Sequence, residues 1–378
     1  MLKIFLTGDA HIGLQYPSWR RGTILAEARL DVFSNMVNTA NDEGCNLFVI
    51  AGDLFESNDQ CSRGEVQKLL DILSQFQGTV AILPGNHDYY DPKAPLWQYL
   101  REIAAAKNNI LLLTNNQPYP VRVGEEWAAF YPAPCRSQHS VNGENNLAWI
   151  KAEEIPDDCN YRIGVAHGTV RGEALDNENL YFPMGRDELN RIPMDVWLLG
   201  HVHVPFPRSL RVDSYTEGER IFNAGTPVQT HHNCNTEGCA FIIQVAPDKR
   251  VSAKKVVVGP YRFFARNINL EAGKMKAGLA AQLRDIPDNS VVDLHLFGAV
   301  SAEEYDHRVE IVEAATYRFF EVNYASFSLT RMLSQEDIKK NFPETSFPAQ
   351  LLNALMAEPK EAQMVFELLA SLKGGSSL

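Results

Sequence analysis

The sequence lacks any apolar run that approaches the ~18 residues of a membrane-spanning helix. Its first apolar stretch, residues 2–6, meets Gly8 and Asp9 too soon to form the apolar region of a signal peptide, and it is typical of a first strand. These absences exclude a helical membrane protein. We therefore expect a protein without membrane contact, located in the cytoplasm.

Cysteine is scarce as well. The six cysteines of this 378-residue chain are scattered at irregular spacings, which excludes a small domain built on disulfides and favours reduced thiols. One suggestive cluster consists of His231, His232 and Cys234, with Cys239 close behind. Because the spacing is loose and polar residues fill the gaps, we interpret this segment as a polar loop in preference to a small zinc site.

A surplus of positive charge is also missing. The chain has 35 Lys and Arg against 47 Asp and Glu, which gives a net charge of −12. A protein that simply binds the phosphate backbone of nucleic acid usually has a basic excess. Bound divalent cations would add positive charge at one site, and a patch can be basic while the whole is acidic. Charge therefore neither supports nor excludes nucleic acid.

The pattern that is present predicts a layered fold. Short apolar runs alternate with helical patterns along the first hundred residues, which predicts an α/β fold whose strands are buried on both faces. Residues 120–160 are rich in Pro, Asn and Glu, and we expect an irregular surface excursion there. The other expected elements are strands near residues 4–6, 47–50, 80–83, 163–165 and 196–199, and helices near residues 24–43 and 66–76.

After Pro260 the pattern changes. Alternating strand and helix signals between Phe263 and Thr316 predict a compact α+β unit. A polar connector is expected over residues 339–348, and two amphipathic helices broken at Pro359 follow it. We therefore predict a first domain over residues 1–260, a smaller α+β domain over residues 261–338 and a helical tail over residues 339–378.

Residues that can bind metal gather in five short motifs, most of which follow a predicted strand. In such folds the chemistry collects on loops at the carboxyl ends of the strands. For any one motif an ordinary turn or a hydrogen-bonded core histidine is the better explanation, but the ordered set would require five coincidences. The motifs are Thr7-Gly8-Asp9-Ala10-His11, Ala51-Gly52-Asp53-Leu54, Pro84-Gly85-Asn86-His87-Asp88, Val165-Ala166-His167-Gly168 and Leu199-Gly200-His201-Val202-His203.

The spacing within these motifs suits metal ions. Asp9 and His11 are two residues apart, as are His201 and His203, so that both side chains of each pair can reach one cation at a strand end. Carboxylate, imidazole and amide oxygen suit manganese, iron or zinc, and the lack of thiolate argues against a structural zinc.

Two adjacent metal ions need a ligand that both of them share, and Asp53 is the natural candidate. A bridging carboxylate can hold two cations about 3.5–4 Å apart. Asn86 would add a neutral oxygen that leaves the Lewis acidity of an ion intact. Two such ions polarise a phosphate ester, activate a water and stabilise the negative transition state.

Next to Asn86, His87 need not bind metal. We predict that it lies over the scissile phosphate and protonates the leaving oxygen. Asp88 is predicted either to orient the His87 ring and keep it protonated or to cap the following turn, and both alternatives stay open.

Taken together, the motifs resemble the calcineurin-like metallophosphoesterase superfamily. Asp9-Ala10-His11-Ile12-Gly13, Ile50-Ala51-Gly52-Asp53-Leu54-Phe55, Leu199-Gly200-His201-Val202-His203 and Gly225-Thr226-Pro227 are most similar to its DNA-repair branch, the SbcD-type nucleases. The resemblance covers roughly residues 1–260, and Gly8 stands where the family usually has serine. It implies a layered β-sandwich flanked by helices, with a smaller α+β capping domain and C-terminal helices.

The resemblance also implies roles for individual residues. The first ion would be held by Asp9, His11 and His203 and the second by Asn86, His167 and His201, with Asp53 shared and His87 catalytic. Relatives use manganese, degrade DNA ends from 3′ to 5′ and cut single strands. They act with an SbcC-like coiled-coil ABC ATPase, often as homodimers. The C-terminal helices would either be a docking element for this ATPase or pack on their own chain, and both alternatives stay open.

Two other functions remain alternatives. A phosphodiesterase for small molecules such as nucleotides would use residues 261–345 as a lid over a narrow site. An interaction subunit that serves as a scaffold for an ATPase would carry a vestigial metal site, against which the intact set of ligands argues.

Overall fold

The computed structural model describes residues 1–150, 159–172, 180–230 and 236–374. The chain divides into two compact units, Met1–Tyr261 and Arg262–Leu378. The segment His231–Cys234, interpreted above as a polar loop, lies outside the described residues. Within them, no helix is long and apolar enough to cross a membrane.

The first unit contains a seven-stranded sheet. Its first four strands are parallel, and β1 also pairs antiparallel with β11, which begins the antiparallel half. This arrangement places the carboxyl ends of β1, β2 and β3 at one edge. The strand order is β4 (Ile110–Leu112), β3 (Thr79–Leu83), β2 (Leu47–Ala51), β1 (Leu2–Thr7), β11 (Cys239–Val245), β12 (Val251–Val257) and β9 (Thr216–Glu217).

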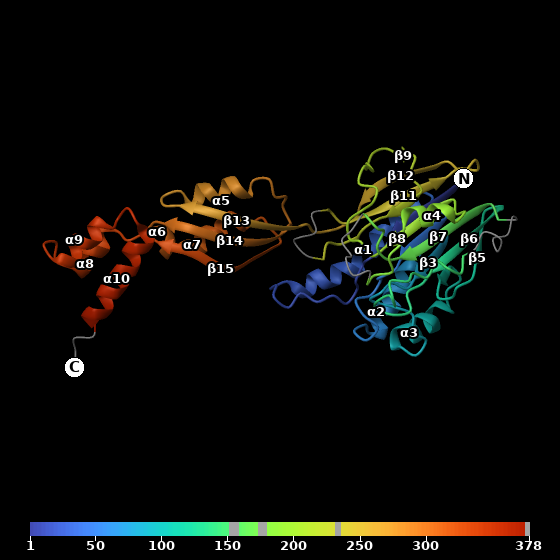
Figure 1. Ribbon diagram of the computed structural model, residues 1–378, viewed down its shortest axis with the longest axis horizontal. Helices are drawn as coiled ribbons and strands as arrows, with labels where there is room; N and C mark the ends of the chain where they lie inside the picture. The colour runs from blue at the N-terminus through green and yellow to red at the C-terminus, as the bar shows by residue number, and fades with distance from the viewer. Residues whose placement is uncertain (151–158, 173–179, 231–235, 375–378) are drawn as a thin grey trace. The chain divides into compact units, whose positions relative to one another are not determined.

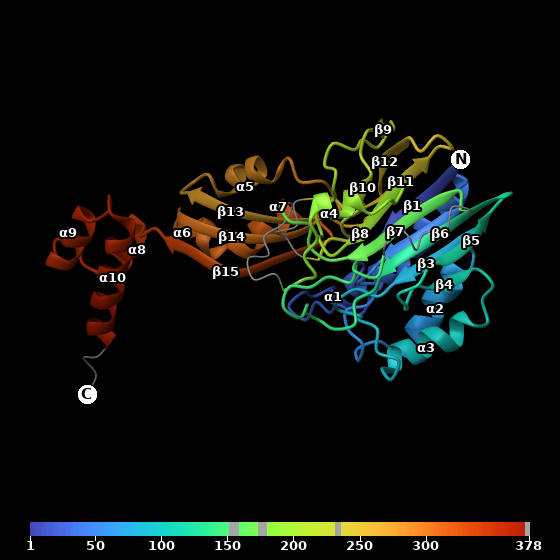
Figure 2. The same cartoon turned by 45° about the vertical axis from the view of Figure 1, so that its right-hand side comes forward.

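A five-stranded sheet forms the second layer, and Figures 1 and 2 show the strands of both sheets. Apolar side chains of β1, β2, β7 and β8, such as Leu6, Val49, Val165 and Leu198, share one buried cluster, so that the two sheets form a sandwich. Its strand order is β10 (Ile221–Asn223), β8 (Val196–Gly200), β7 (Tyr161–His167), β6 (Glu126–Ala133) and β5 (Tyr119–Val123).

Helices cover the outer faces of the sandwich. The apolar faces of α1, α2 and α3 share a cluster with the outward side chains of the first sheet, including Phe48 and Ile82. Beside the second sheet, Leu189 of α4 packs near Trp197. The layered α/β fold predicted from the sequence is thus observed. The bounds are α1 (Gly22–Asp42), α2 (Arg63–Leu73), α3 (Pro95–Ala104) and α4 (Arg186–Arg191).

The prediction of an irregular excursion over residues 120–160 is wrong for the first part of this range. Strand β6 lies there and pairs with both β5 and β7, and Ala128 and Phe130 are fully buried. Alanine and proline in this strand have weak β propensity, so the local pattern does not reveal it and the neighbouring strands determine it. Residues 151–158 lie outside the described part of the chain.

The second unit begins with a parallel three-stranded sheet whose strands are linked by helices. Leu279 of α5 and Val312 of α7 pack with Ile268, Leu294 and other sheet residues in one core. Between β14 and β15 the helical segment is divided at His307, where α6 ends and α7 begins. The bounds are β13 (Phe263–Glu271), α5 (Met275–Leu283), β14 (Val291–Val300), α6 (Ala302–Asp306), α7 (Arg308–Thr316) and β15 (Glu321–Arg331).

Three helices, α8 (Gln335–Asn341), α9 (Phe347–Ala354) and α10 (Pro359–Gly374), complete the second unit. The polar connector expected over residues 339–348 is partly wrong because α8 extends into it, stabilised by a capping box between Ser334 and Asp337. The two expected tail helices are α9 and α10, and Pro359 is the first residue of α10, where proline is tolerated.

Candidate metal centre

All five sequence motifs end strands that point to one edge of the sandwich. Asp9 and His11 follow β1, Asp53 follows β2, and the Asn86 motif follows β3, while His167 ends β7. His201 and His203 come directly after β8. Since these strands are parallel within their sheets and the sheets pack face to face, their carboxyl ends bring the motifs together.

The potential ligands form three overlapping groups: Asp9, His11 and His203; His11, Asp53 and His87; and Asp53, His167 and His201. In each group the ligand atoms lie within 4.8 Å of one another. His11 and Asp53 are each shared between two groups, which is the arrangement that two adjacent cations need. We call the first group the β1 group and the third the β7 group.

In the β1 group two imidazoles face each other. The Nε2 atoms of His11 and His203 are 3.1 Å apart. The other nitrogen of each ring is held from behind: His11 Nδ1 bonds Glu56 Oε2 at 2.8 Å, and His203 Nδ1 lies 3.3 Å from Thr230 Oγ1. These outer contacts leave both Nε2 atoms directed at one point.

The β7 group converges on the side-chain oxygen of Asn86. His167 Nε2 lies 3.0 Å and His201 Nδ1 2.9 Å from Asn86 Oδ1. His167 Nδ1 donates to the carbonyl oxygen of Ala51 at 2.8 Å, which fixes the ring so that Nε2 faces the site. Asn86 Oδ1 therefore lies within hydrogen-bonding distance of both histidines of this group.

Asp53 lies between the groups. Its Oδ2 is 3.3 Å from His167 Nε2 and 3.8 Å from His11 Nε2, and its Oδ1 accepts a hydrogen bond from the backbone N–H of His87 at 2.8 Å. Asp53, Asp9 and His167 are each at most 2% exposed. The carboxylate thus occupies the position that a bridging ligand requires.

The backbone is bent to allow this convergence. Asp9, His11, Asp53 and His201 all have positive φ angles, between 48° and 97°, which non-glycine residues rarely adopt. Gly52 also has a positive φ, of 92°, and a Cβ there would lie 2.2 Å from His167 Nδ1. Glycine is therefore needed at position 52 so that the ends of β2 and β7 can approach closely.

Burial and neighbouring charges shift the pKa values of several residues of the site. Burial raises the pKa of Asp9 to about 7, against the opposing effect of His167. His167 has its pKa raised to about 9, since the Asp53 carboxylate outweighs the effect of burial. For His203, burial and the neighbouring His11 lower the pKa to about 3. A divalent cation suits this site because it would neutralise the carboxylates and accept the imidazole lone pairs.

His87 lies at the solvent side of the site, and its side chain is 34% exposed. Its Nδ1 donates to the carbonyl oxygen of Glu56 at 3.0 Å. The carboxylate of Asp88 accepts hydrogen bonds from the N–H groups of Gly85 and Phe55, at 2.7 and 3.1 Å. These contacts favour the turn-capping alternative for Asp88 over the orientation of the His87 ring.

Sequence reasoning missed Glu56. It contacts His11 through its carboxylate and His87 through its carbonyl oxygen, so it orients one residue from each of two motifs. Burial would raise its pKa, but the hydrogen bond from His11 together with the charges of His11, His87 and Arg29 lowers it. The only available signal was an acidic residue three positions after Asp53, a spacing that carries little information by itself.

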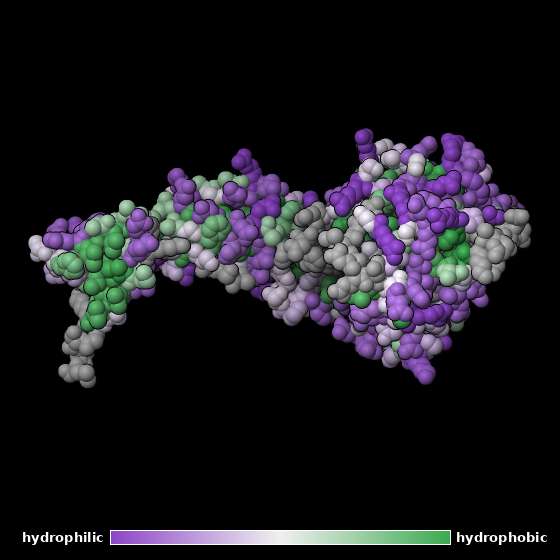
Figure 3. Space-filling model, in the orientation of Figure 1, coloured by the Kyte–Doolittle hydropathy of each residue, from purple (hydrophilic) through white to green (hydrophobic). Residues whose placement is uncertain are grey.

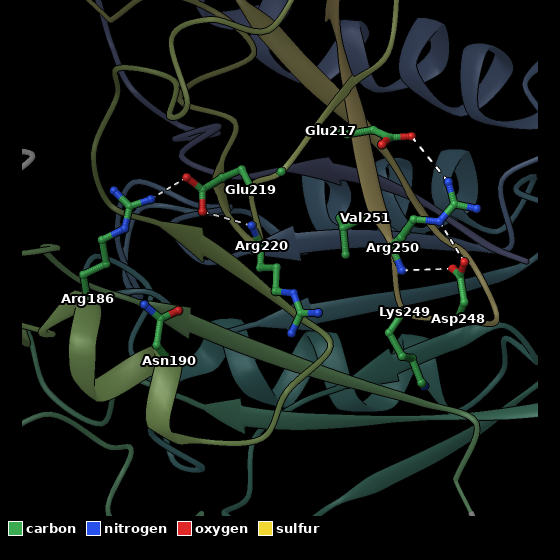
Figure 4. Close-up of a pocket in the computed structure, with 10 residues that line it drawn as sticks. Arg186, Asn190, Glu217, Glu219, Arg220, Asp248, Lys249, Arg250 and Val251 are labelled. Carbon is green, nitrogen blue, oxygen red and sulfur yellow. Dashed lines mark hydrogen bonds and ion pairs between the residues drawn. The ribbon is translucent and has the colours of Figure 1, made fainter.

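A separate polar pocket of the first unit, of about 610 Å³, contains none of the predicted site residues among those that line it. Figure 4 shows that its charges pair with one another, Arg186 with Glu219 and Arg250 with Asp248 and Glu217. Cations and acids nearly balance there, so the pocket points to no particular ligand.

Comparisons with known proteins agree with the geometry. A sequence model of the family Calcineurin-like phosphoesterase matches residues 2–205, more than half of the chain. Over 174 residues the chain is 24% identical to Uncharacterized metallophosphoesterase YhaO of Bacillus subtilis (strain 168). This match covers 45% of the chain and 39% of the relative, so the chain spans about two fifths of that protein's length.

Two solved structures are also similar. The crystal structure of TT1561 of Thermus thermophilus has 12% sequence identity and a TM-score of 0.40, and the match covers 68% of this chain and 99% of that one. Purple acid phosphatase PPD1 from yellow lupin (Lupinus luteus) seeds has 13% identity and a TM-score of 0.36, with 64% and 49% covered.

Proposed function

The chain belongs to the calcineurin-like phosphoesterase family, and from this membership we propose that it is a manganese-dependent DNA nuclease with 3′ to 5′ exonuclease and single-strand endonuclease activities. Family and candidate ligands make it a metal-dependent phosphoesterase. The observation that supports two ions is the sharing of His11 and Asp53 between overlapping ligand groups. The choice of manganese over iron or zinc, and of DNA as substrate, rests on the resemblance of the motifs.

Each residue has a role in this proposal. The β1 group would hold the first ion, the β7 group with Asn86 the second, and Asp53 both. When bound, the ions polarise the phosphate and make the attacking water more acidic. The chain's own contribution is rigidity: Glu56 and the carbonyl of Ala51 hold the rings of His11 and His167, so that little reorganisation accompanies binding.

His87 would supply the proton. Because a carbonyl oxygen only accepts, Nδ1 of His87 carries the hydrogen that bonds Glu56, and Nε2 is the atom that can donate to a leaving oxygen. Its partial exposure beside buried ligands places it where a phosphodiester from solvent would arrive. A general acid of this kind typically contributes about 10²- to 10⁴-fold to the rate.

An aromatic pair beside the site supports a nucleic-acid substrate. The ring of Tyr181 lies 4.8 Å from that of His201, and His139 lies 5.4 Å from Tyr181. Aromatic side chains next to a catalytic centre bind unpaired bases by stacking, with little preference for sequence.

For a partner, we propose an SbcC-like coiled-coil ABC ATPase that docks on α10. Met364, Leu368 and Leu372 recur every four residues and are 59–65% exposed, forming an apolar stripe on one face of the helix. Figure 3 shows apolar surface over this helix. Such a stripe fits a helix-in-groove or coiled-coil contact. Leu368→Glu should abolish co-purification with the co-expressed ATPase while hydrolysis persists, and an unchanged complex would place the docking surface elsewhere.

The nuclease proposal is tested with end-labelled single- and double-stranded DNA in manganese, magnesium or chelator. We expect shortening from 3′ ends in manganese, its loss in chelator, and its loss in Asp53→Asn and His87→Gln. Hydrolysis of a small phosphodiester by the same preparation without cutting of any DNA would support the small-molecule enzyme instead.

A further inference from the structure

A fully buried arginine lies behind the metal centre. Arg29 on α1 is 0% exposed, although guanidinium groups are almost never buried without a charged partner. Within the described residues, every hydrogen bond that this guanidinium donates ends on an uncharged oxygen. The acceptors are Ala10 O at 2.6 Å, Tyr16 Oη at 2.7 and 3.0 Å, Gln229 O at 2.8 Å and Val228 O at 3.3 Å.

Burying this charge costs free energy unless the surroundings compensate for the lost hydration. A guanidinium taken out of water loses several kcal/mol of hydration by order of magnitude, and neutral carbonyls return only part of that. The negative charge nearby belongs to the metal centre, since Arg29 also acts electrostatically on Glu56.

One acceptor of Arg29 lies in the loop that carries two residues of the β1 group, and another lies next to a residue that contacts the third. Ala10 lies between Asp9 and His11, which both have positive φ, of 53° and 49°. Gln229 precedes Thr230, whose hydroxyl contacts His203. One planar guanidinium therefore ties the segment that supplies Asp9 and His11 to a segment, about two hundred residues away in sequence, whose Thr230 contacts His203.

The β7 group is held in other ways. His167 is fixed by the carbonyl of Ala51, and both His167 and His201 lie within hydrogen-bonding distance of Asn86 Oδ1. The backbone N–H of His201 donates to Asp9 and so links the two groups. None of the hydrogen bonds of Arg29 reaches the loops that carry His167 or Asn86.

We propose that Arg29 is a positioning residue chiefly for one ion: it assembles the β1 group, whereas its link to the β7 group is indirect, through the hydrogen bond from His201 to Asp9. This inference rests on the proposed two-ion site. It predicts a selective defect, whereas an arginine that merely stabilised the fold would weaken both ions or neither.

The test is manganese binding to the whole chain, measured by calorimetry and by the spin-coupled signal of paired Mn²⁺ in electron paramagnetic resonance. Arg29→Lys keeps the positive charge but loses the planar set of guanidinium N–H donors, and Arg29→Met removes both the charge and the donors. We expect one ion to bind as in the unchanged protein and the other about ten- to hundredfold more weakly, with loss of the coupled signal. The matched control is Arg101→Lys, because Arg101 also donates to backbone carbonyls, of Trp97 and Pro92, but lies on α3.

Tyr16→Phe removes one acceptor of Arg29 without touching the arginine, and it decides the matter if the Arg29 variants fail to fold. It should weaken the same single ion, by a smaller factor. Two ions with unchanged affinities in folded variants, or an equal loss of both, would overturn the inference. Fewer than two ions in the unchanged protein would overturn the two-ion site itself, and with it the selective role of Arg29.

Discussion

Glu56 offers a sharp test of how the site is held together. Replacing it with Gln keeps the shape and the backbone carbonyl that holds His87, but it removes the charge that holds His11 at 2.8 Å. Loss of a carboxylate behind a metal-binding histidine typically costs about ten- to hundredfold in metal affinity. At 1.4 kcal/mol per tenfold, this corresponds to about 1.4–2.8 kcal/mol.

The assay is the hydrolysis of bis(p-nitrophenyl) phosphate as a function of manganese concentration. Glu56→Gln should raise the half-saturating concentration of manganese by about ten- to hundredfold and nearly restore the maximal rate at saturation, since His87 keeps its position. Asp59→Asn, an exposed change in the same loop, is the matched control and should leave both values unchanged. An unchanged manganese requirement in Glu56→Gln would refute the view that this carboxylate orients His11.

Three further changes have defined outcomes. Gly52→Ala should abolish manganese binding and lower the free energy of unfolding by about 2 kcal/mol or more, because the new Cβ would meet His167. Gly44 also has a positive φ but no atom lies within 4 Å of the position that a Cβ would take, so Gly44→Ala, the control, should lower the free energy of unfolding by only about 1 kcal/mol. Equal shifts of the melting temperature in the two variants would contradict this prediction. Against the effect of burial, hydrogen bonds from an arginine and a serine hold the pKa of Asp337 at about 2, so Asp337→Asn should lower the melting temperature at pH 7, with a difference that shrinks below pH 4 and vanishes near pH 2. Tyr181→Ala should raise KM for single-stranded DNA about fivefold or more but leave bis(p-nitrophenyl) phosphate hydrolysis unchanged, and a parallel loss on both substrates would argue against base stacking.

The sequence predicts the parts of the fold whose local pattern and tertiary role agree. Strands β1, β2, β3, β7 and β8 are short apolar runs buried on both faces, and the motif at each carboxyl end identifies the edge where they meet. Strand β6 escapes prediction because its alanines are weak strand formers, and only the pairing with β5 and β7 determines its conformation.

For the site, residue type and spacing identify the residues that converge but not those that support them. Glu56 and Arg29 belong to no recognisable pattern, and their importance depends on which atoms lie opposite them after folding. Similarly, the two roles weighed for Asp88 could be compared only when its carboxylate was seen to accept from two backbone N–H groups. Contacts between residues far apart in sequence decide such questions, and they leave little trace in a single chain.

The central claim is that two cations share Asp53, and anomalous X-ray scattering at the manganese edge from crystals soaked in manganese chloride tests it most directly. The account predicts two peaks on either side of the Asp53 carboxylate. One should lie among Asp9, His11 and His203, and the other among Asn86, His167 and His201. A single peak, or peaks that Asp53 does not touch, would contradict it.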